Sequence, residues 1–280
     1  MPAASRAIWP DWRQVDVMLR QRILRRRRWR AVGVVLAQVA LLCGAKVLLH
    51  RAGFELIVVN HLFSAIVAST VFLLGFLLSG VLADFKEAEK IPARFAASLE
   101  ALSLEIGAIR AFQPAAQVEP AREAVAGLGR LLVVWLCGRC ETEEVLLGYR
   151  ATHVAVVQAA VQYRGDVSSL RGRLMQSMAL ILEMIHRVHV IRETSFVPLV
   201  YWLAYLGSSL LFGGLLLARS DYWLDSLFFL AVISFLVLLI LRLIADIDNP
   251  FGLGDPASAE NVSIEVLERA VAVLEQPPSA

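Results

Sequence analysis

Four long stretches of apolar residues constrain this chain more than any other feature of its sequence. They cover residues 31–49, 56–83, 196–218 and 224–245. At about 1.5 Å per helical residue, each is long enough to cross the roughly 30 Å of hydrocarbon in a bilayer. The composition agrees, because 58% of the residues are hydrophobic and only 19% are charged, unlike a soluble domain. We therefore predict an all-α membrane protein with four transmembrane helices.

Basic residues before the first apolar stretch predict its orientation. The first thirty residues hold nine arginines against two acids, and the run from Arg25 to Arg28 directly precedes the first span. The positive-inside rule then places the amino terminus in the cytoplasm, and four spans return the carboxyl terminus to the same side. Attraction to anionic headgroups explains this run better than nucleic-acid binding, so we expect membrane lipids as the partner, and no nucleic acid. Lys46, near the end of the first span, is expected to reach the headgroups.

The predicted spans divide the chain into a cytosolic amino-terminal segment, a first pair of membrane helices, a cytosolic helical domain, a second pair of membrane helices and a cytosolic tail. These five segments cover residues 1–30, 31–83, 84–195, 196–245 and 246–280. Apolar residues recurring every three or four positions predict further helices in the domain and the tail. These helices are expected near residues 128–136, 145–161, 170–190 and 262–274.

Two cysteines form a Cys-Gly-Arg-Cys sequence, Cys137 to Cys140, on one of the predicted cytosolic helices. A redox pair would need a thioredoxin-like strand-to-helix context, and a metal site would need a second pair of ligands. Neither is visible in the sequence. We favour two reduced cysteines without a catalytic role.

A second polar group, formed by Glu183, His186 and His189, recurs at helical spacing. A Glu followed three residues later by His is half of the di-metal signature of helical bundles, which needs a second such pair and further carboxylates. A polar stripe facing solvent or an interface is the favoured interpretation. The chain also lacks nucleotide-binding loops and nucleophile motifs, so we expect neither an enzyme nor a cofactor.

The second apolar stretch carries the most functional information. It is rich in small residues, which let membrane helices approach closely, yet Ala68, Phe72 and Phe76 follow one another at intervals of four and share one helical face. Copies of this helix around an axis would form a hydrophobic constriction, and the positive edges of phenylalanine rings can favour a partly dehydrated anion. The alternative, that the rings only pack against neighbouring helices, stays open at this point.

Three sequence motifs resemble those of one channel family, the bestrophins. The first is Val-Phe-Leu-Leu-Gly-Phe at residues 71–76, followed by Asp-Phe-Lys-Glu-Ala-Glu-Lys-Ile-Pro at 84–92. The second is Ser-Phe-Val-Pro-Leu-Val-Tyr at 195–201, and the third is Asp-Asn-Pro-Phe-Gly at 248–252. They occur in the family's order and at nearly its spacing, and the resemblance covers about residues 10–270.

The resemblance implies a homopentameric ion channel with one axial pore and passive conduction of small inorganic ions. Within it, the edges of the phenylalanine rings favour anions such as chloride. The neck of the pore falls on Ala68, Phe72 and Phe76, where Ala68 departs from the larger aliphatic residue usual in the family. A lower, cytosolic aperture falls on Leu170. The alternatives are a cation-selective channel of the same kind and a non-conducting membrane scaffold or sensor.

Two properties of this expected channel depend on charged residues. Acids at Asp84, Glu87 and Glu89 could enrich cations, whereas bases at Lys86, Lys90 and Arg94 would oppose them, and the sequence does not reveal which set faces the axis. Animal bestrophins bind calcium through an acidic run after the Asn-Pro-Phe-Gly motif. Here only Asp255 and the distant Glu260 follow it, too few oxygens for a hard cation, so no metal site is expected.

Overall fold

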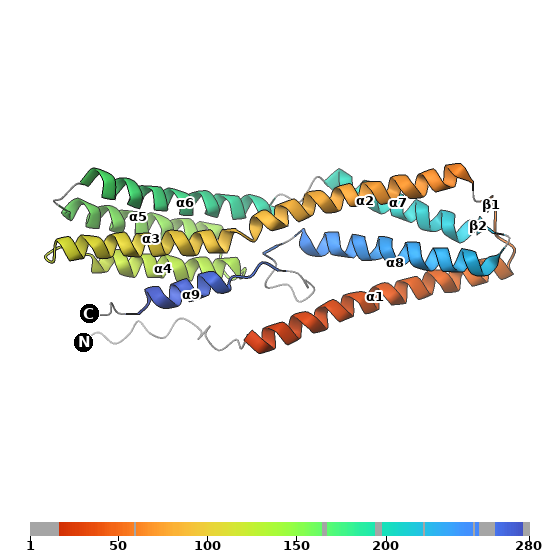
Figure 1. The fold of residues 1–280 in the computed structure, drawn as a ribbon, viewed down its shortest axis with the longest axis horizontal. Coiled ribbons are helices and arrows are strands. Elements are labelled where there is room, and N and C mark those ends of the chain that lie inside the picture. Colours follow the sequence, from red (N-terminus) through yellow and green to blue (C-terminus); the bar gives the residue numbers. More distant parts are fainter. Residues whose placement is uncertain are drawn as a thin grey trace. The chain divides into compact units, whose positions relative to one another are not determined.

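The computed structural model describes residues 17–58, 60–163, 167–193, 198–220, 222–248, 250–251 and 261–276. Nearly all of them lie in long helices, which confirms the all-α prediction (Figure 1). The helices are α1 (Val17–Arg51), α2 (His61–Ala88), α3 (Ile91–Phe112), α4 (Glu119–Leu136), α5 (Thr142–Gln162), α6 (Val167–Glu193), α7 (Pro198–Leu217), α8 (Trp223–Ile247) and α9 (Glu265–Leu274).

The described residues also contain one small sheet that the sequence analysis missed. Strand β1 (Ile57–Val58) pairs in parallel with β2 (Ala218–Arg219), with Ile57 opposite Ala218. Two residues are too few for the alternation by which strands are predicted, and the partner strand lies far away in the sequence. The sheet also explains why α2 begins at His61 and not at the predicted Leu56.

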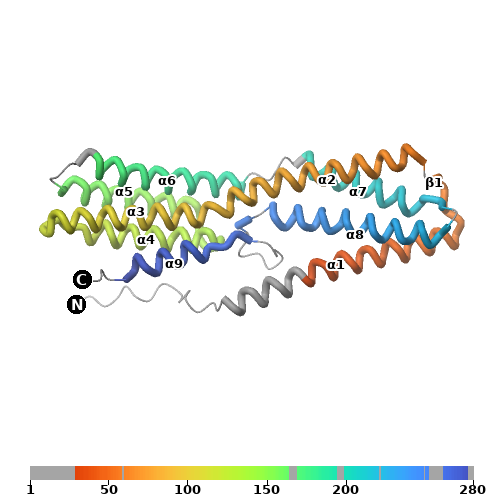
Figure 2. The backbone as a smooth tube through the Cα atoms, viewed as in Figure 1, coloured from red at the N-terminus to blue at the C-terminus, as the bar shows by residue number. Residues whose placement is uncertain are grey.

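Among the described residues, five helical stretches are long and apolar enough to cross a membrane, judged by length and composition. They are Trp29–Arg51, His61–Phe112, Ser169–Glu193, Leu199–Leu217 and Trp223–Ile247. Four of them overlap the predicted spans. The second is long because α2 passes into α3 with only a short turn between them (Figure 2). The remaining stretch, Ser169–Glu193, lies in α6, which was predicted to be cytosolic.

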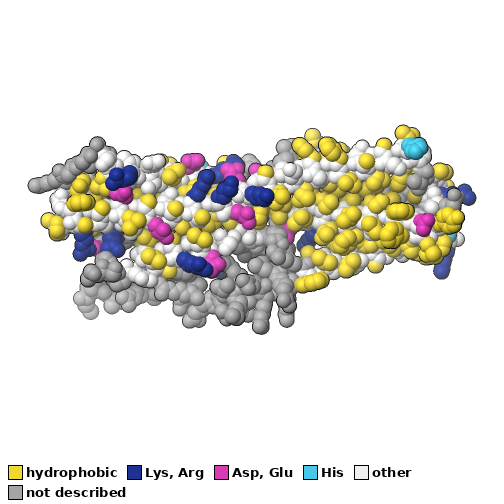
Figure 3. All heavy atoms as spheres, in the orientation of Figure 1, with side chains coloured by type: hydrophobic (Ala, Val, Ile, Leu, Met, Phe, Trp, Pro, Cys, Tyr) yellow, Lys and Arg dark blue, Asp and Glu magenta, His cyan; other side chains and the backbone are white. Residues whose placement is uncertain are grey.

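The described residues fall into two compact units. Unit 1 contains residues 17–72 and 206–242, and unit 2 contains residues 73–205, 243–251 and 261–276. In unit 1 the side chains facing outward are mainly apolar, and on the face drawn in Figure 3 those over α8 are mostly hydrophobic. This surface is what a membrane-embedded helix presents to lipid.

Unit 2 has a continuous hydrophobic core between α3, α4, α5, α6 and α9. Its largest fully buried side chains include Phe95 and Trp135. Charged side chains gather over the outside of these helices in Figure 3. Arg173 of α6 forms a bidentate ion pair with Glu105 of α3, with N–O distances of 2.6 and 3.0 Å. An apolar core under a charged surface is typical of a water-exposed helical domain.

Candidate functional site

Helix α2 holds the three residues predicted to form the pore neck, and its first turn is well defined. The backbone N–H of Phe63 donates to the side-chain Oδ1 of Asn60 at 2.9 Å, so Asn60 caps the helix. From there α2 runs for 28 residues. Ala68, Phe72 and Phe76 lie two to four turns from its start. They are therefore away from the helix ends, where fraying would change the direction of a side chain.

One side of α2 is packed inside the protomer. The buried residues of the helix recur at helical spacing and fall on a single face, given about 100° of rotation per residue. They are Thr70, Leu74, Leu77, Val81 and Ala88. Thr70 is the only polar member, and its hydroxyl donates to the carbonyl of Ile66 at 2.9 Å, which satisfies it. This face anchors α2 in the protomer.

The predicted neck residues lie on the opposite face of α2. The Phe72 side chain is 77% exposed and that of Phe76 is 63% exposed, and Ala68 one turn earlier is exposed as well. The two rings are therefore largely uncovered by the described residues of their own chain. They face lipid, a pore or another copy of the chain.

Small side chains surround the two rings. Ala65, Ser69, Gly75 and Ser79 are all exposed on the same side of α2. A lipid-facing helix is usually covered by large aliphatic residues, whereas small residues let the backbones of neighbouring helices approach each other. This surface suits close contact with other helices better than contact with lipid tails.

Leu170, the predicted aperture residue, occupies a different environment. It is only 7% exposed and begins a stripe of buried residues on α6 that belongs to the core of unit 2. This stripe continues through Leu174, Met178, Ile181, Ile185 and Val188. Within one protomer Leu170 is a packing residue. Its role as an aperture depends on how copies of the chain assemble and stays a prediction.

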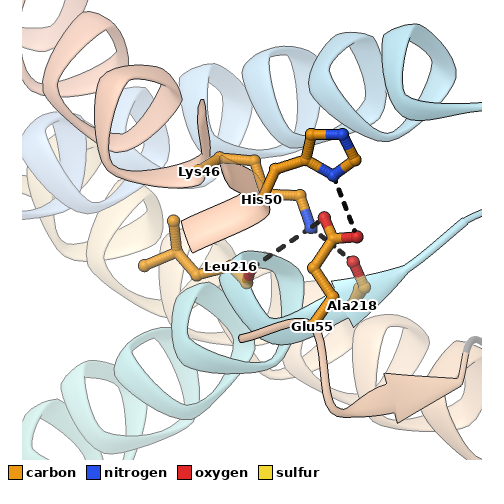
Figure 4. A network of polar contacts seen from close by, with 5 residues as sticks. All are labelled: Lys46, His50, Glu55, Leu216 and Ala218. Carbon is orange, nitrogen blue, oxygen red and sulfur yellow. Dashed lines mark hydrogen bonds and ion pairs between the residues drawn. The ribbon is translucent and has the colours of Figure 1, made fainter. Parts of the chain in front are cut away.

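A polar network closes one end of unit 1, around Lys46 (Figure 4). Lys46 is only 3% exposed, and its ammonium group lies 2.8 Å from Glu55 Oε1. It also donates to the backbone carbonyls of Leu216, at 3.2 Å, and Ala218. The expectation that Lys46 reaches the headgroups is therefore wrong, because all three of its donors are used inside the protein.

The carboxylate of Glu55 joins this network to His50. Its second oxygen lies 3.1 Å from His50 Nδ1, and the imidazole ring stacks on Trp223 with 6.0 Å between ring centroids. The hydrogen bond from Lys46 lowers the pKa of the Glu55 carboxyl below its usual value. The network thus ties the end of α1 to the following loop, to the end of α7 and to the start of α8.

The Cys137–Cys140 pair lies in a turn and not on a helix as predicted. Helix α4 ends at Leu136, and Gly138 adopts a left-handed conformation with φ of 71°. The N–H of Gly138 donates to Trp135 and that of Arg139 to Val134, which is the Schellman pattern of a helix end. Burial raises the pKa of the Cys140 thiol to about 11, so it is protonated at neutral pH. This turn is a structural helix terminus.

Arg192 stabilises the same helix end. Its guanidinium donates to the carbonyls of Trp135, at 2.8 Å, and Leu136, at 3.1 Å, and lies over the rings of Trp135 and Phe251. Phe251 is the phenylalanine of the Asn-Pro-Phe-Gly motif and is almost fully buried. The motif therefore anchors the chain after α8 to the core of unit 2. Asp255 and Glu260 lie outside the described residues.

Glu183, His186 and His189 lie on one side of α6. Glu183 and His186 are exposed, and His189 Nε2 lies 3.4 Å from a carboxylate oxygen of Glu193 in the next turn. Among the described residues no three His, Cys, Asp or Glu side chains come together as a metal site would require.

The whole fold is similar to solved bestrophin structures. A bacterial bestrophin homolog from Klebsiella pneumoniae matches with a TM-score of 0.62 at 16% identity, covering 88% of this chain and 98% of that chain. A single-substitution variant of that homolog reaches a TM-score of 0.67 at 17% identity, over 88% of this chain and 99% of the other. A structure described as a membrane protein matches with a TM-score of 0.62 at 14% identity, over 88% and 99%.

The other two comparisons found nothing, since no protein-family model and no curated protein sequence matches the chain. At these low identities the structural matches show the fold alone. The fold is bestrophin-like, which confirms for the fold the resemblance seen in the sequence motifs.

Proposed function

We propose that this chain forms a homopentameric ion channel that conducts small inorganic ions passively, with anions such as chloride favoured. The observation that carries the proposal is the exposed face of α2, which presents Phe72 and Phe76 directly opposite the face that packs in the protomer. One face of this helix is buried in the protomer, and the other exposes aromatic rings among small residues. Such a helix is suited to line the central axis of an oligomer. The bestrophin-like fold supports the same arrangement.

In the proposed channel the two phenylalanine rings form the neck. Five copies of Phe72 and Phe76 around an axis make two stacked apolar rings, with Ala68 as a wider ring one turn away. When such an apolar constriction is narrow it excludes water, and ions cannot pass. Conduction is therefore gated by dewetting. The positive edges of the rings stabilise a partly dehydrated anion more than a cation.

The proposed topology keeps the predicted segments. Residues 31–83 and 196–245 cross the membrane, and residues 1–30, 84–195 and 246–280 lie in the cytoplasm. Although α6 is apolar enough to span a bilayer, Arg173 and Arg187 of α6 form ion pairs with acids of α3 and α2 on its surface. Charges paired at a helix surface favour the cytosolic placement of α6, since ionisable groups in contact with lipid are costly.

Two measurements on the purified protein test this proposal. The mass in mild detergent should be about five times 30.9 kDa. In planar bilayers with a KCl gradient, the protein should carry current whose reversal potential lies on the chloride side of zero. A stable monomer or the absence of current contradicts the channel and favours a membrane scaffold or sensor, whereas a reversal potential on the potassium side indicates a cation channel.

A further inference from the structure

Acidic and basic residues both lie at the end of α2 that follows the neck. An ion pair with α6 distinguishes the charges that are paired from those that are not. Arg187 of α6 holds Glu87 through two hydrogen bonds, from Nε to Oε1 at 3.0 Å and from Nη2 to Oε2 at 2.6 Å. Asp84, nearly one turn before Glu87, interacts electrostatically with the same guanidinium. Glu87 is therefore turned toward α6 and its charge is paired there, and Asp84 lies near the same cation.

Lys86 lies on a different side of the helix. At about 100° per residue, Ser79 and Lys86 follow Phe72 at intervals of seven and stay within about 40° of it. Ala83 falls in the same sector, and all three side chains are exposed. The packed residues at this level, Val81 and Ala88, lie on the reverse side. The face that carries the neck phenylalanines thus continues to Lys86.

The ammonium group of Lys86 has no hydrogen bond or ion pair with any described residue. Its distance below Phe76 along α2 is about 15 Å, for ten residues at 1.5 Å each. By the same count Glu89, the remaining acid of this stretch, lies about 100° from Phe72, whereas Glu87 lies about 60° from Phe72 and is held by Arg187. Lys86 and Glu87 therefore border the neck face on its two sides, and of the two Lys86 is the one whose charge no described residue pairs.

We propose that Lys86 sets the sign of the permeant ion by placing a ring of positive charge at the cytosolic mouth of the neck. The proposal rests on the channel function proposed above and names the residue that acts on ion choice. A ring of one sign in a narrow vestibule with low-dielectric walls concentrates counter-ions, by a factor of ten or more. Lys86 thus favours chloride without binding it tightly.

The main experiment measures reversal potentials in planar bilayers under a KCl gradient. Lys86→Gln should lower the chloride-to-potassium permeability ratio, and Lys86→Glu should lower it by about tenfold or more. Arg139→Glu is the matched control, because it makes the same change of charge at an exposed residue in the α4–α5 turn. An unchanged ratio in Lys86→Glu, or a larger effect of Asp84→Asn, overturns the role of Lys86.

A second measurement does not need current. In the full-length protein in lipid nanodiscs, Ala83→Cys places a thiol on the same face, three residues before Lys86. This thiol should react faster with an anionic than with a cationic thiosulfonate reagent. Mass spectrometry measures the extent of modification at that site over time. Adding Lys86→Gln should reduce this preference about tenfold. If Lys86→Gln leaves the preference for the anionic reagent unchanged, the positive ring is refuted, even if the protein conducts. If the preference is present and depends on Lys86 but the wild type carries no current, only the channel function is refuted.

Discussion

Val271 of α9 occupies the space that a side chain on Gly129 of α4 would need. A Cβ atom built on Gly129 would lie 2.8 Å from Val271 Cγ2 and 3.3 Å from Leu99 Cδ1 of α3. Only a glycine lets α4 approach α9 and α3 this closely. The short tail helix is thereby locked into the core of unit 2.

Gly129→Ala should therefore lower the stability of the protein by about 1–3 kcal/mol, because the added methyl group overpacks this contact. Thermal unfolding in detergent measures the effect. Gly127→Ala is the matched control in the same helix, since its nearest neighbour would be 3.9 Å away and the change should stabilise by about 0.5–1 kcal/mol. Val271→Ala should rescue Gly129→Ala. If both alanine variants stabilise the protein equally, the close contact does not exist.

Lys46→Met should be strongly destabilising. It leaves the partly buried carboxylate of Glu55 without its main partner, which costs about 3–5 kcal/mol for a buried ion pair. Combining it with Glu55→Gln should recover much of the loss, as a double-mutant cycle of melting temperatures would reveal. Breaking the exposed Arg269–Glu265 pair with Arg269→Ala should cost less than about 1 kcal/mol. Equal losses in the two single variants would contradict the burial of Lys46.

The same network should make stability depend on acid pH. Because the folded state lowers the pKa of Glu55 below the usual value of about 4.3, the ionised carboxylate stabilises the protein fully above that value. This contribution is lost as the pH falls through the lowered folded-state pKa. Between pH 7 and pH 3, the melting temperature should fall further in the wild type than in Glu55→Gln. Parallel pH profiles would show that Glu55 is not held as described.

Replacing Phe72 and Phe76 together by alanine should raise the conductance or the open probability in bilayer recordings, because two apolar rings are removed from the proposed neck. Both side chains are exposed in the protomer, so the melting temperature should change little. Leu74→Ala, on the packed face of α2, should instead cost about 2–5 kcal/mol. Unfolding of the double variant would mean that the rings are packed.

Leu170→Ala separates the packing role of Leu170 from its predicted role as an aperture. Truncating this buried side chain should cost about 2–5 kcal/mol. An aperture additionally requires that permeability ratios between small and large anions change. Leu174→Ala makes the same truncation in a fully buried residue one turn later and should leave those ratios alone. Identical ratios in both variants would move the aperture elsewhere.

The sequence predicted the parts of the fold that local patterns determine. Apolar stretches located α1, α2, α7 and α8, and the structure places Pro92 and Pro120 in the first turns of α3 and α4. Intervals of four placed Ala68, Phe72 and Phe76 on one face. Which way that face points was not readable, because it depends on where Thr70 and Leu74 pack.

Two errors have identifiable physical causes. Gly138 within the Cys-Gly-Arg-Cys sequence was a signal for a helix end, since glycine readily adopts the left-handed conformation found there, and it was not used. The sequence held no comparable signal that Lys46 is buried, because two of its partners are backbone carbonyls at and just after the end of α7. Backbone acceptors leave no trace in residue identities. The role proposed for Lys86 likewise depends on the pairing of Glu87 with Arg187, a contact between residues one hundred positions apart.

The Lys46 network also fixes an order in which the protein can be built. Its carboxylate partner follows nine residues later, but the carbonyls of Leu216 and Ala218 follow 170 and 172 residues later. During synthesis, Lys46 and Glu55 can pair as soon as the loop after α1 has emerged. The remaining two donors must wait until almost all of α3 to α7 has been translated. In the proposed topology, the first hairpin therefore enters the bilayer with these two donors unpaired, and the last pair of membrane helices supplies their acceptors.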